Sequence, residues 1–137
     1  DVLGILRLIE PLEREGVLVK RSRELLEAEI DQFVVIERDG LLIGCAALFD
    51  FNQVGEVACV VTHPDYRKSD RGDRLLDAIE SRAKKLAIKR LFVLTTQSIH
   101  WFIERGFKEC AFDELPLEKR KFYNLQRNSR ALEKYLL

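Results

Sequence analysis

The most informative stretch of the sequence runs from Val57 to Ile79, where an apolar run leads into a basic, glycine-containing segment and then into a helical pattern. The first turn of a helix has free N–H groups and a partial positive charge. A loop that directs these groups to one point therefore forms an anion site. Arg67, Lys68, Arg71 and Arg74 add positive charge around that point. We expect the anion to be a pyrophosphate; the alternative is a solvated, charged loop before a surface helix.

Glu56 is the second residue that could do chemistry. It interrupts the apolar run from Val54 to Thr62, an environment that makes a carboxylate a stronger base. Such a carboxylate can accept a proton from a reacting group as a general base. The alternative is a glutamate at the edge of the strand, on its solvent side.

The elements that must position these residues follow from hydrophobic spacing and turn residues. Helical spacing predicts helices over residues 2–16, 22–30, 72–86 and 98–105. Apolar, β-branched and aromatic runs predict strands over residues 33–36, 41–49, 54–62, 90–95, 107–112 and 130–136, and residues 116–124 are expected to be helical or irregular. Asp1 and Ser22 are the expected N-caps, and Asp39-Gly40 is the expected turn of a hairpin. Pro11 is expected to bend or end the first helix, which Gly16 can stop.

This order of elements predicts an α/β fold with a mixed sheet, in which a hairpin comes first and a crossover helix later. No repeat, low-complexity stretch or linker interrupts the 137 residues, so we expect one domain over residues 1–137. The sequence has no Met, and we expect the natural protein to extend upstream of Asp1.

Composition limits the classes of function. The sequence contains 23 basic and 23 acidic residues, so nothing in its net charge suggests a nucleic-acid or membrane partner. It has neither a bilayer-spanning apolar run nor a signal peptide, and we expect a cytoplasmic protein. Its three cysteines, Cys45, Cys59 and Cys110, are expected to be reduced thiols, and no Cys/His spacing suggests a metal site.

Residues 67–72, Arg-Lys-Ser-Asp-Arg-Gly, resemble the acetyl-CoA motif of GNAT acetyltransferases, Q/R-x-x-G-x-G/A. The first and last positions match, whereas Asp70 stands where the family has its middle glycine. Aspartate tolerates a left-handed backbone better than most residues, but its carboxylate beside a pyrophosphate would weaken binding. The resemblance implies that loop N–H groups hold the pyrophosphate and that the preceding strand pairs with the pantetheine arm of acetyl-CoA. The implied cofactor-binding residues are Cys59, Val60, Thr62, Arg67, Lys68, Ser69, Asp70, Arg71, Gly72 and Asp73.

Longer motifs resemble the acetyltransferase domain of N-acetylglutamate synthases. They are residues 20–24, 55–60, 91–96, 100–107 and 126–129. The resemblance implies transfer of acetyl from acetyl-CoA to the α-amine of L-glutamate, the first step of arginine biosynthesis. It also implies an upstream amino-acid-kinase-like domain, a first strand before the first helix and assembly into a homo-oligomer. The kinase-like domain and the first strand are expected to be missing from this sequence.

Roles follow from this resemblance residue by residue. Glu56 matches the proposed general base, and Thr95 matches the hydroxyl that protonates the leaving thiolate. Ser98 is a second candidate for that proton donor, or alternatively the N-cap of its helix. Attack of the amine on the thioester gives a tetrahedral intermediate that carries an oxyanion. A backbone N–H of Cys59 or Val60, freed by a bulge, would stabilise this oxyanion. The positions that bind the two carboxylates of glutamate are Arg21, Arg127 and Ser129.

Two other readings stay open. The acceptor could be another amine, such as a peptide N-terminus or a lysine, since pocket shape sets specificity. The chain could also be a non-catalytic module that binds acyl-CoA, for which Asp70 is the best support.

Overall fold

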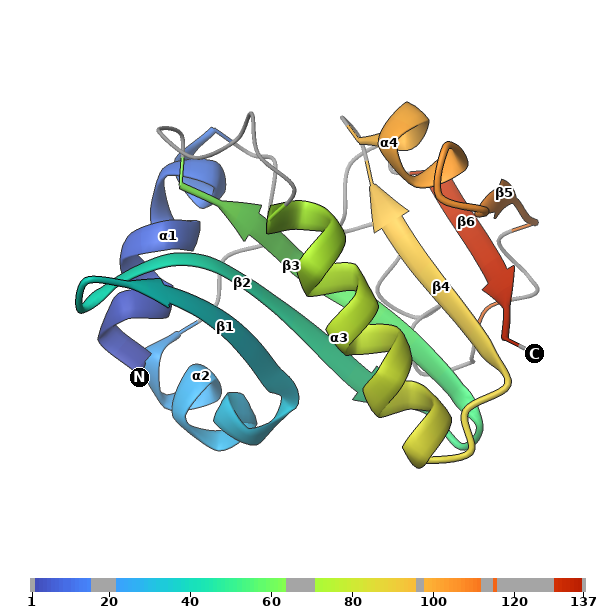
Figure 1. The fold of residues 1–137 in the computed structure, drawn as a ribbon, viewed down its shortest axis with the longest axis horizontal. Coiled ribbons are helices and arrows are strands. Elements are labelled where there is room, and N and C mark those ends of the chain that lie inside the picture. Colours follow the sequence, from blue (N-terminus) through green and yellow to red (C-terminus); the bar gives the residue numbers. More distant parts are fainter. Residues whose placement is uncertain are drawn as a thin grey trace.

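The computed structural model describes residues 2–15, 22–63, 71–95, 98–111, 115 and 130–136. Its core is a six-stranded sheet in the order β1-β2-β3-β4-β6-β5, in which only the β3–β4 pair is parallel. Figure 1 shows the helices on the two faces of this sheet. The predicted α/β fold with a mixed sheet is therefore confirmed. The elements in chain order are α1 (Val2–Arg14), α2 (Arg23–Glu29), the 3-10 turn η1 (Ile30–Gln32), β1 (Phe33–Arg38), β2 (Leu41–Asp50), β3 (Val54–Thr62), α3 (Arg71–Lys85), β4 (Arg90–Thr95), α4 (Ile99–Ile103), β5 (Lys108–Glu109) and β6 (Arg130–Tyr135).

The predicted hairpin joins β1 and β2. Asp39 and Gly40 both have positive φ, 53° and 79°, as the two central residues of a type I′ turn require. Arg38 pairs with Leu41 directly across this turn. Ser22 caps α2 as predicted, because its hydroxyl accepts a hydrogen bond from the backbone N–H of Leu25 at 3.1 Å.

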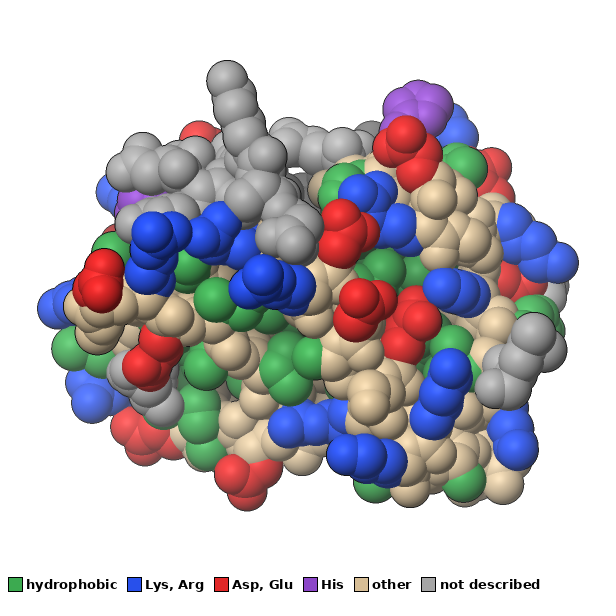
Figure 2. All heavy atoms as spheres, viewed as in Figure 1, with side chains coloured by type: hydrophobic (Ala, Val, Ile, Leu, Met, Phe, Trp, Pro, Cys, Tyr) green, Lys and Arg blue, Asp and Glu red, His purple; other side chains and the backbone are tan. Residues whose placement is uncertain are grey.

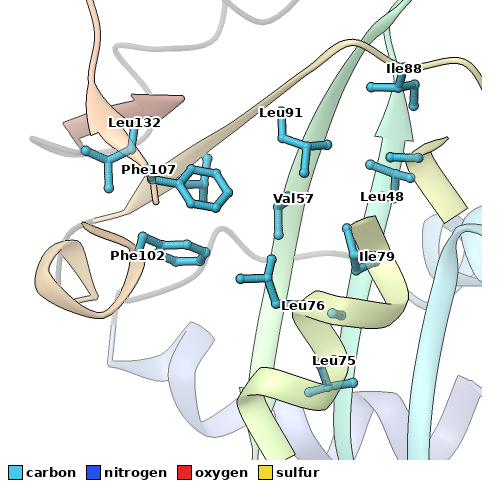
Figure 3. Close-up of a cluster of buried hydrophobic side chains, with 13 residues drawn as sticks. Leu48, Val57, Leu75, Leu76, Ile79, Ile88, Leu91, Phe102, Phe107 and Leu132 are labelled. Atoms are coloured by element: carbon cyan, nitrogen blue, oxygen red, sulfur yellow. The ribbon is translucent and has the colours of Figure 1, made fainter. Parts of the chain in front are cut away.

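Two buried clusters lie on opposite faces of the sheet because successive residues of a strand point to opposite sides. On β2, Ala46 and Leu48 pack in the cluster of α3, whereas Cys45 and Ala47 pack in the cluster of α1 and α2. Figure 3 shows the α3 cluster, where Phe102 from the α4 region lies near Leu76 of α3. The crossover helix α3, which joins the parallel strands β3 and β4, thus rests on one face of the sheet, and α1 and α2 rest on the other.

The two parallel strands separate after a short contact. The β3–β4 ladder covers only Val54–Glu56 against Arg90–Phe92, although β3 continues to Thr62 and β4 to Thr95. Figure 1 shows the two strands diverging toward the edge where α3 begins and α4 lies. The carboxyl ends of both strands and the first turn of α3 therefore share one edge of the sheet.

Some boundaries differ from those expected. Pro11 stays inside α1, since Ile9 and Leu12 on either side of it pack in the same cluster and hold the helix together. The strand expected over residues 107–112 is reduced to Lys108–Glu109. The expectations for Asp1, Gly16 and residues 116–124 lie outside the described residues. No helix in the part of the chain that the structure describes is long and apolar enough to cross a membrane.

Candidate functional site

Glu56 lies at the last paired position of the β3–β4 ladder, immediately before the two strands diverge. It pairs with Phe49 of β2 on one side and Phe92 of β4 on the other. The residue is only 5% exposed, so the alternative of a solvent-facing glutamate at a strand edge is wrong. A buried carboxylate at a strand junction is placed to interact with a group bound between the strand ends.

A second buried carboxylate lies on the same face of the sheet. Among the described residues, Glu56 and Glu133 are the two buried charged side chains. Glu133 of β6 pairs with Phe92, which separates it from Glu56 by one strand. The guanidinium of Arg90 donates from Nε to Oε1 of Glu133 at 2.7 Å. This ion pair compensates the buried negative charge of Glu133.

The predicted bulge in β3 begins three residues beyond Glu56. Cys45 pairs with Val61 and Ala47 with Ala58, so Cys59 and Val60 together face a single residue of β2. Cys59 has a φ of 54°, the left-handed conformation that a bulge residue adopts. Its carbonyl accepts a weak hydrogen bond from the Cys45 thiol at 3.5 Å. The bulge thus changes the direction of backbone groups at the position proposed for oxyanion binding.

Cys45, Cys59 and Cys110 are reduced thiols, as expected. Burial, with a smaller contribution from the neighbouring Cys59, raises the pKa of the Cys45 thiol far above its ordinary value. The thiol of Cys45 is therefore a packing group rather than a nucleophile.

Thr95 ends β4, and its hydroxyl is fixed by the chain that follows. The backbone N–H of Ser98 donates to Oγ1 of Thr95 at 3.1 Å. Because the hydroxyl oxygen accepts this bond, its hydrogen remains available for donation to another group. Ser98 is the N-cap residue of α4, as the alternative reading of Ser98 expected: its carbonyl accepts a hydrogen bond from the N–H of Phe102 at 3.1 Å, but its side chain makes no capping hydrogen bond.

The first turn of α3 holds three of the expected cofactor-binding residues, Arg71, Gly72 and Asp73. Asp73 is engaged by Arg105, whose Nε donates to Oδ1 at 2.6 Å and whose Nη2 donates to Oδ2 at 3.3 Å. This hydrogen bonding and the guanidinium charge hold the pKa of the Asp73 carboxyl below its ordinary value. Arg105 also lies over the Trp101 ring, 4.0 Å from its centroid. The carboxylate of Asp73, in the first turn of α3, is therefore held by the positive charge of Arg105.

Sequence analysis assigned no functional role to Trp101 or Arg105, although both lie in the motif at residues 100–107. Arg105 follows α4, which ends at Ile103, so helical spacing gave no signal for this contact. Sequence analysis also missed the Arg90–Glu133 pair, since only the register between β4 and β6 brings these two residues together. The remaining expected site residues, Arg67, Lys68, Ser69, Asp70, Arg21, Arg127 and Ser129, lie outside the described residues.

The described part of the face that carries α3 bears charged side chains of both signs. Figure 2 shows acidic and basic side chains interspersed over the face that carries α3, with hydrophobic side chains exposed between them. No group of three or more His, Cys, Asp or Glu side chains that could hold a metal ion occurs in the described part of the chain.

Comparison with known proteins places these features in a family. A family model described as the acetyltransferase (GNAT) family matches residues 3–107. An amino-acid acetyltransferase from Aeromonas salmonicida is 58% identical over 136 residues, which are 98% of this chain and 31% of that protein. A protein of the same name from Serratia proteamaculans is also 58% identical, over 134 residues. The chain thus spans about a third of the length of these curated relatives.

Solved structures show the same fold. The structure of N-acetylglutamate synthase from Neisseria gonorrhoeae, complexed with coenzyme A and N-acetyl-glutamate, matches with a TM-score of 0.97 and 44% identity. That match covers 100% of this chain and 33% of the synthase chain. The structure of Rv2747 from Mycobacterium tuberculosis matches with a TM-score of 0.86 at 23% identity and covers 95% of that chain.

Proposed function

The chain belongs to the GNAT family of acetyltransferases, and we propose that it transfers the acetyl group of acetyl-CoA to the α-amine of L-glutamate. The products are N-acetylglutamate and CoA. The observation that carries the proposal is the buried Glu56 at the end of the β3–β4 ladder, in a chain 44% identical to a synthase solved with coenzyme A and N-acetyl-glutamate.

The chemistry requires a base near the amine. An α-ammonium group must lose a proton before its nitrogen can attack the thioester carbonyl. In the proposed reaction Glu56 takes that proton, directly or through a water. The nitrogen then attacks the thioester carbonyl to form a tetrahedral intermediate, which loses a second proton from nitrogen to solvent and expels the thiolate as the C–S bond breaks and the amide forms.

The leaving thiolate requires a proton. Thr95 stands at the carboxyl end of β4 with its hydroxyl oxygen bonded to the Ser98 N–H. This bond leaves the hydroxyl hydrogen to point at the thiolate, and Thr95 is the proposed donor, with Ser98 as the second candidate. Backbone N–H groups at the Cys59–Val60 bulge are proposed to stabilise the oxyanion.

The first turn of α3 fits an anionic ligand. It begins a 15-residue helix and contains Gly72, and the Asp73 carboxylate within it is already engaged by Arg105. Residues 67–73 are proposed to hold the pyrophosphate, and the backbone of Cys59, Val60 and Thr62 to pair with the pantetheine arm. Arg21, Arg127 and Ser129 are proposed to bind the two carboxylates of glutamate.

The experiment is a comparison of amines as acetyl acceptors. The chain is incubated with acetyl-CoA and L-glutamate, L-aspartate, L-glutamine, L-lysine or a peptide amine, and acetylated products are measured by mass spectrometry. We expect N-acetylglutamate to form fastest. Faster acetylation of another amine would exclude glutamate as the preferred substrate. No product with any amine, together with CoA binding by calorimetry, would favour a binding module.

Glu56→Gln tests the base. We expect kcat to fall about 10²–10⁴-fold, the usual contribution of a general base, with little change in CoA affinity. Glu27→Gln is the matched control, because Glu27 is an exposed glutamate on α2. Equal activity of the two variants would remove Glu56 from the mechanism.

Arg127→Ala tests binding of the substrate carboxylates. This variant is expected to raise KM for glutamate and to leave KM for acetyl-CoA unchanged.

A further inference from the structure

The glycine in the first turn of α3 is closely approached by α4. A Cβ added at Gly72 would lie 2.9 Å from Cζ2 of Trp101, which is closer than real side-chain contacts. Gly72 is not among the residues with positive φ, so its backbone conformation is open to alanine. An alanine at this position would therefore meet the indole ring rather than backbone strain.

The indole is itself held in place by two kinds of contact. Its ring packs edge-to-face against Phe102, with centroids 4.9 Å apart, and Arg105 stacks over it. Nη1 of Arg105 donates to the carbonyl oxygen of Trp101 at 2.8 Å. The same guanidinium reaches across to Asp73. Arg105 thus ties the Trp101 ring and the first turn of α3 to each other.

This contact joins the two halves of the proposed site. α3 supplies the turn proposed for the pyrophosphate, whereas α4 follows Thr95 at the end of β4. We propose that Trp101 and Arg105 are positioning residues that set the first turn of α3 against the end of β4. On this view Gly72 is glycine so that the indole can press against the turn. The inference rests on the proposed function only in assuming that this turn binds acetyl-CoA.

A double-mutant cycle between Gly72 and Trp101 tests the contact. Gly72→Ala places a methyl group against the indole, and Trp101→Phe removes the ring edge that carries Cζ2. CoA affinity is measured by calorimetry for the wild-type chain, both single variants and the double variant. We expect Gly72→Ala to weaken CoA binding about tenfold in the wild-type background and by much less in the Trp101→Phe background, as coupled neighbours behave.

Arg105→Lys tests the second contact, because lysine keeps the charge and loses both the stacking and the paired bonds to Asp73. We expect weaker CoA binding and a raised KM for acetyl-CoA, with kcat less affected. Arg82→Lys is the matched control: Arg82 lies in the same helix α3 and bonds the carbonyl of Asp31, away from the first turn. Trp101 is the single tryptophan of the sequence, so its fluorescence should change on CoA addition and respond less in Arg105→Lys.

The outcomes separate this inference from the proposed function. If Gly72→Ala weakens binding equally in both backgrounds, the role given to Trp101 is overturned, because the glycine then acts through the ligand or the backbone. If no variant changes CoA affinity, the positioning role is also overturned. CoA binding with the expected coupling, but without acetylation of glutamate, would sustain the positioning role and refute the proposed acceptor. Melting temperatures of all variants, measured without ligand, identify any loss of affinity that comes from unfolding.

Discussion

The buried ion pair between Arg90 and Glu133 makes a sharp prediction about stability. It joins β4 to β6 through a 2.7 Å bond, and the two side chains are only 13% and 6% exposed. Glu133→Gln keeps the shape of the side chain and removes its charge, so a buried guanidinium loses the charge of its partner. We expect this variant to be strongly destabilised.

The magnitude follows from burial. Removing one partner of a buried ion pair costs about 3–5 kcal/mol, and glutamine can still accept one hydrogen bond, which places the expected loss near 3 kcal/mol. The exposed pair Arg23–Glu27 provides the reference: its bond is 3.1 Å long and its side chains are 65% and 55% exposed. Breaking a helix-surface pair of this kind costs about 0.3–0.5 kcal/mol.

The assay is urea unfolding followed by circular dichroism. With a slope of about 2 kcal/mol per M of urea, a loss of 3 kcal/mol lowers the midpoint by about 1.5 M for Glu133→Gln, whereas Glu27→Gln should barely move it. The double variant Arg90→Met/Glu133→Leu should recover most of the loss, since apolar residues can replace a buried pair. The reasoning is refuted if Glu133→Gln unfolds at the same urea concentration as Glu27→Gln.

Two further predictions concern the end of α3 and the buried thiol. Ala87 has a left-handed φ of 60°, and the N–H of Ile88 bonds the carbonyl of Ala83 at 2.9 Å, as at a helix end that favours glycine. Ala87→Gly should stabilise the chain by about 0.5–1 kcal/mol, because relief of strain outweighs the added chain entropy, and an unchanged urea midpoint would contradict this. Cys45, whose pKa is raised chiefly by burial, should react with iodoacetamide far more slowly than the half-buried Cys110. Peptide mapping measures the rate at each cysteine, and equal rates would show that the core around Cys45 opens in solution.

Local signals predicted the local structure. Asp39-Gly40 was sufficient to predict the hairpin, because few residues tolerate two successive positive φ angles. Ser22 predicted the start of α2, because its hydroxyl can accept a hydrogen bond from a backbone N–H in the first turn of the helix. Pro11 was expected to bend or end α1, and the helix does not end there, because packing on both sides of Pro11 outweighs the lost hydrogen bond. At Pro11, tertiary contacts therefore outweighed a strong local preference.

Contacts between distant segments could not be predicted in the same way. The pair Arg90–Glu133 depends on the register of β4 against β6, and Gly72–Trp101 depends on how two helices approach. A hydrophobic pattern specifies which face of an element is buried but not which partner it meets. The motif glycine was therefore found from the sequence, while the reason for it came from the structure.

The position of Glu56 can be argued from the geometry of the strand. One residue earlier or later, the side chain would point to the α3 face, because side chains alternate along a strand. Two residues later it would lie at Ala58, past the end of the β3–β4 ladder and next to the bulge. A bulge bends a strand and increases its twist, so the bulge at Cys59 and Val60 helps β3 turn away from β4 just beyond Glu56. Position 56 is the last paired position of β3 with β4 on the face opposite α3. A side chain at this position is thus buried beside β4 and lies next to the point where the two strands diverge.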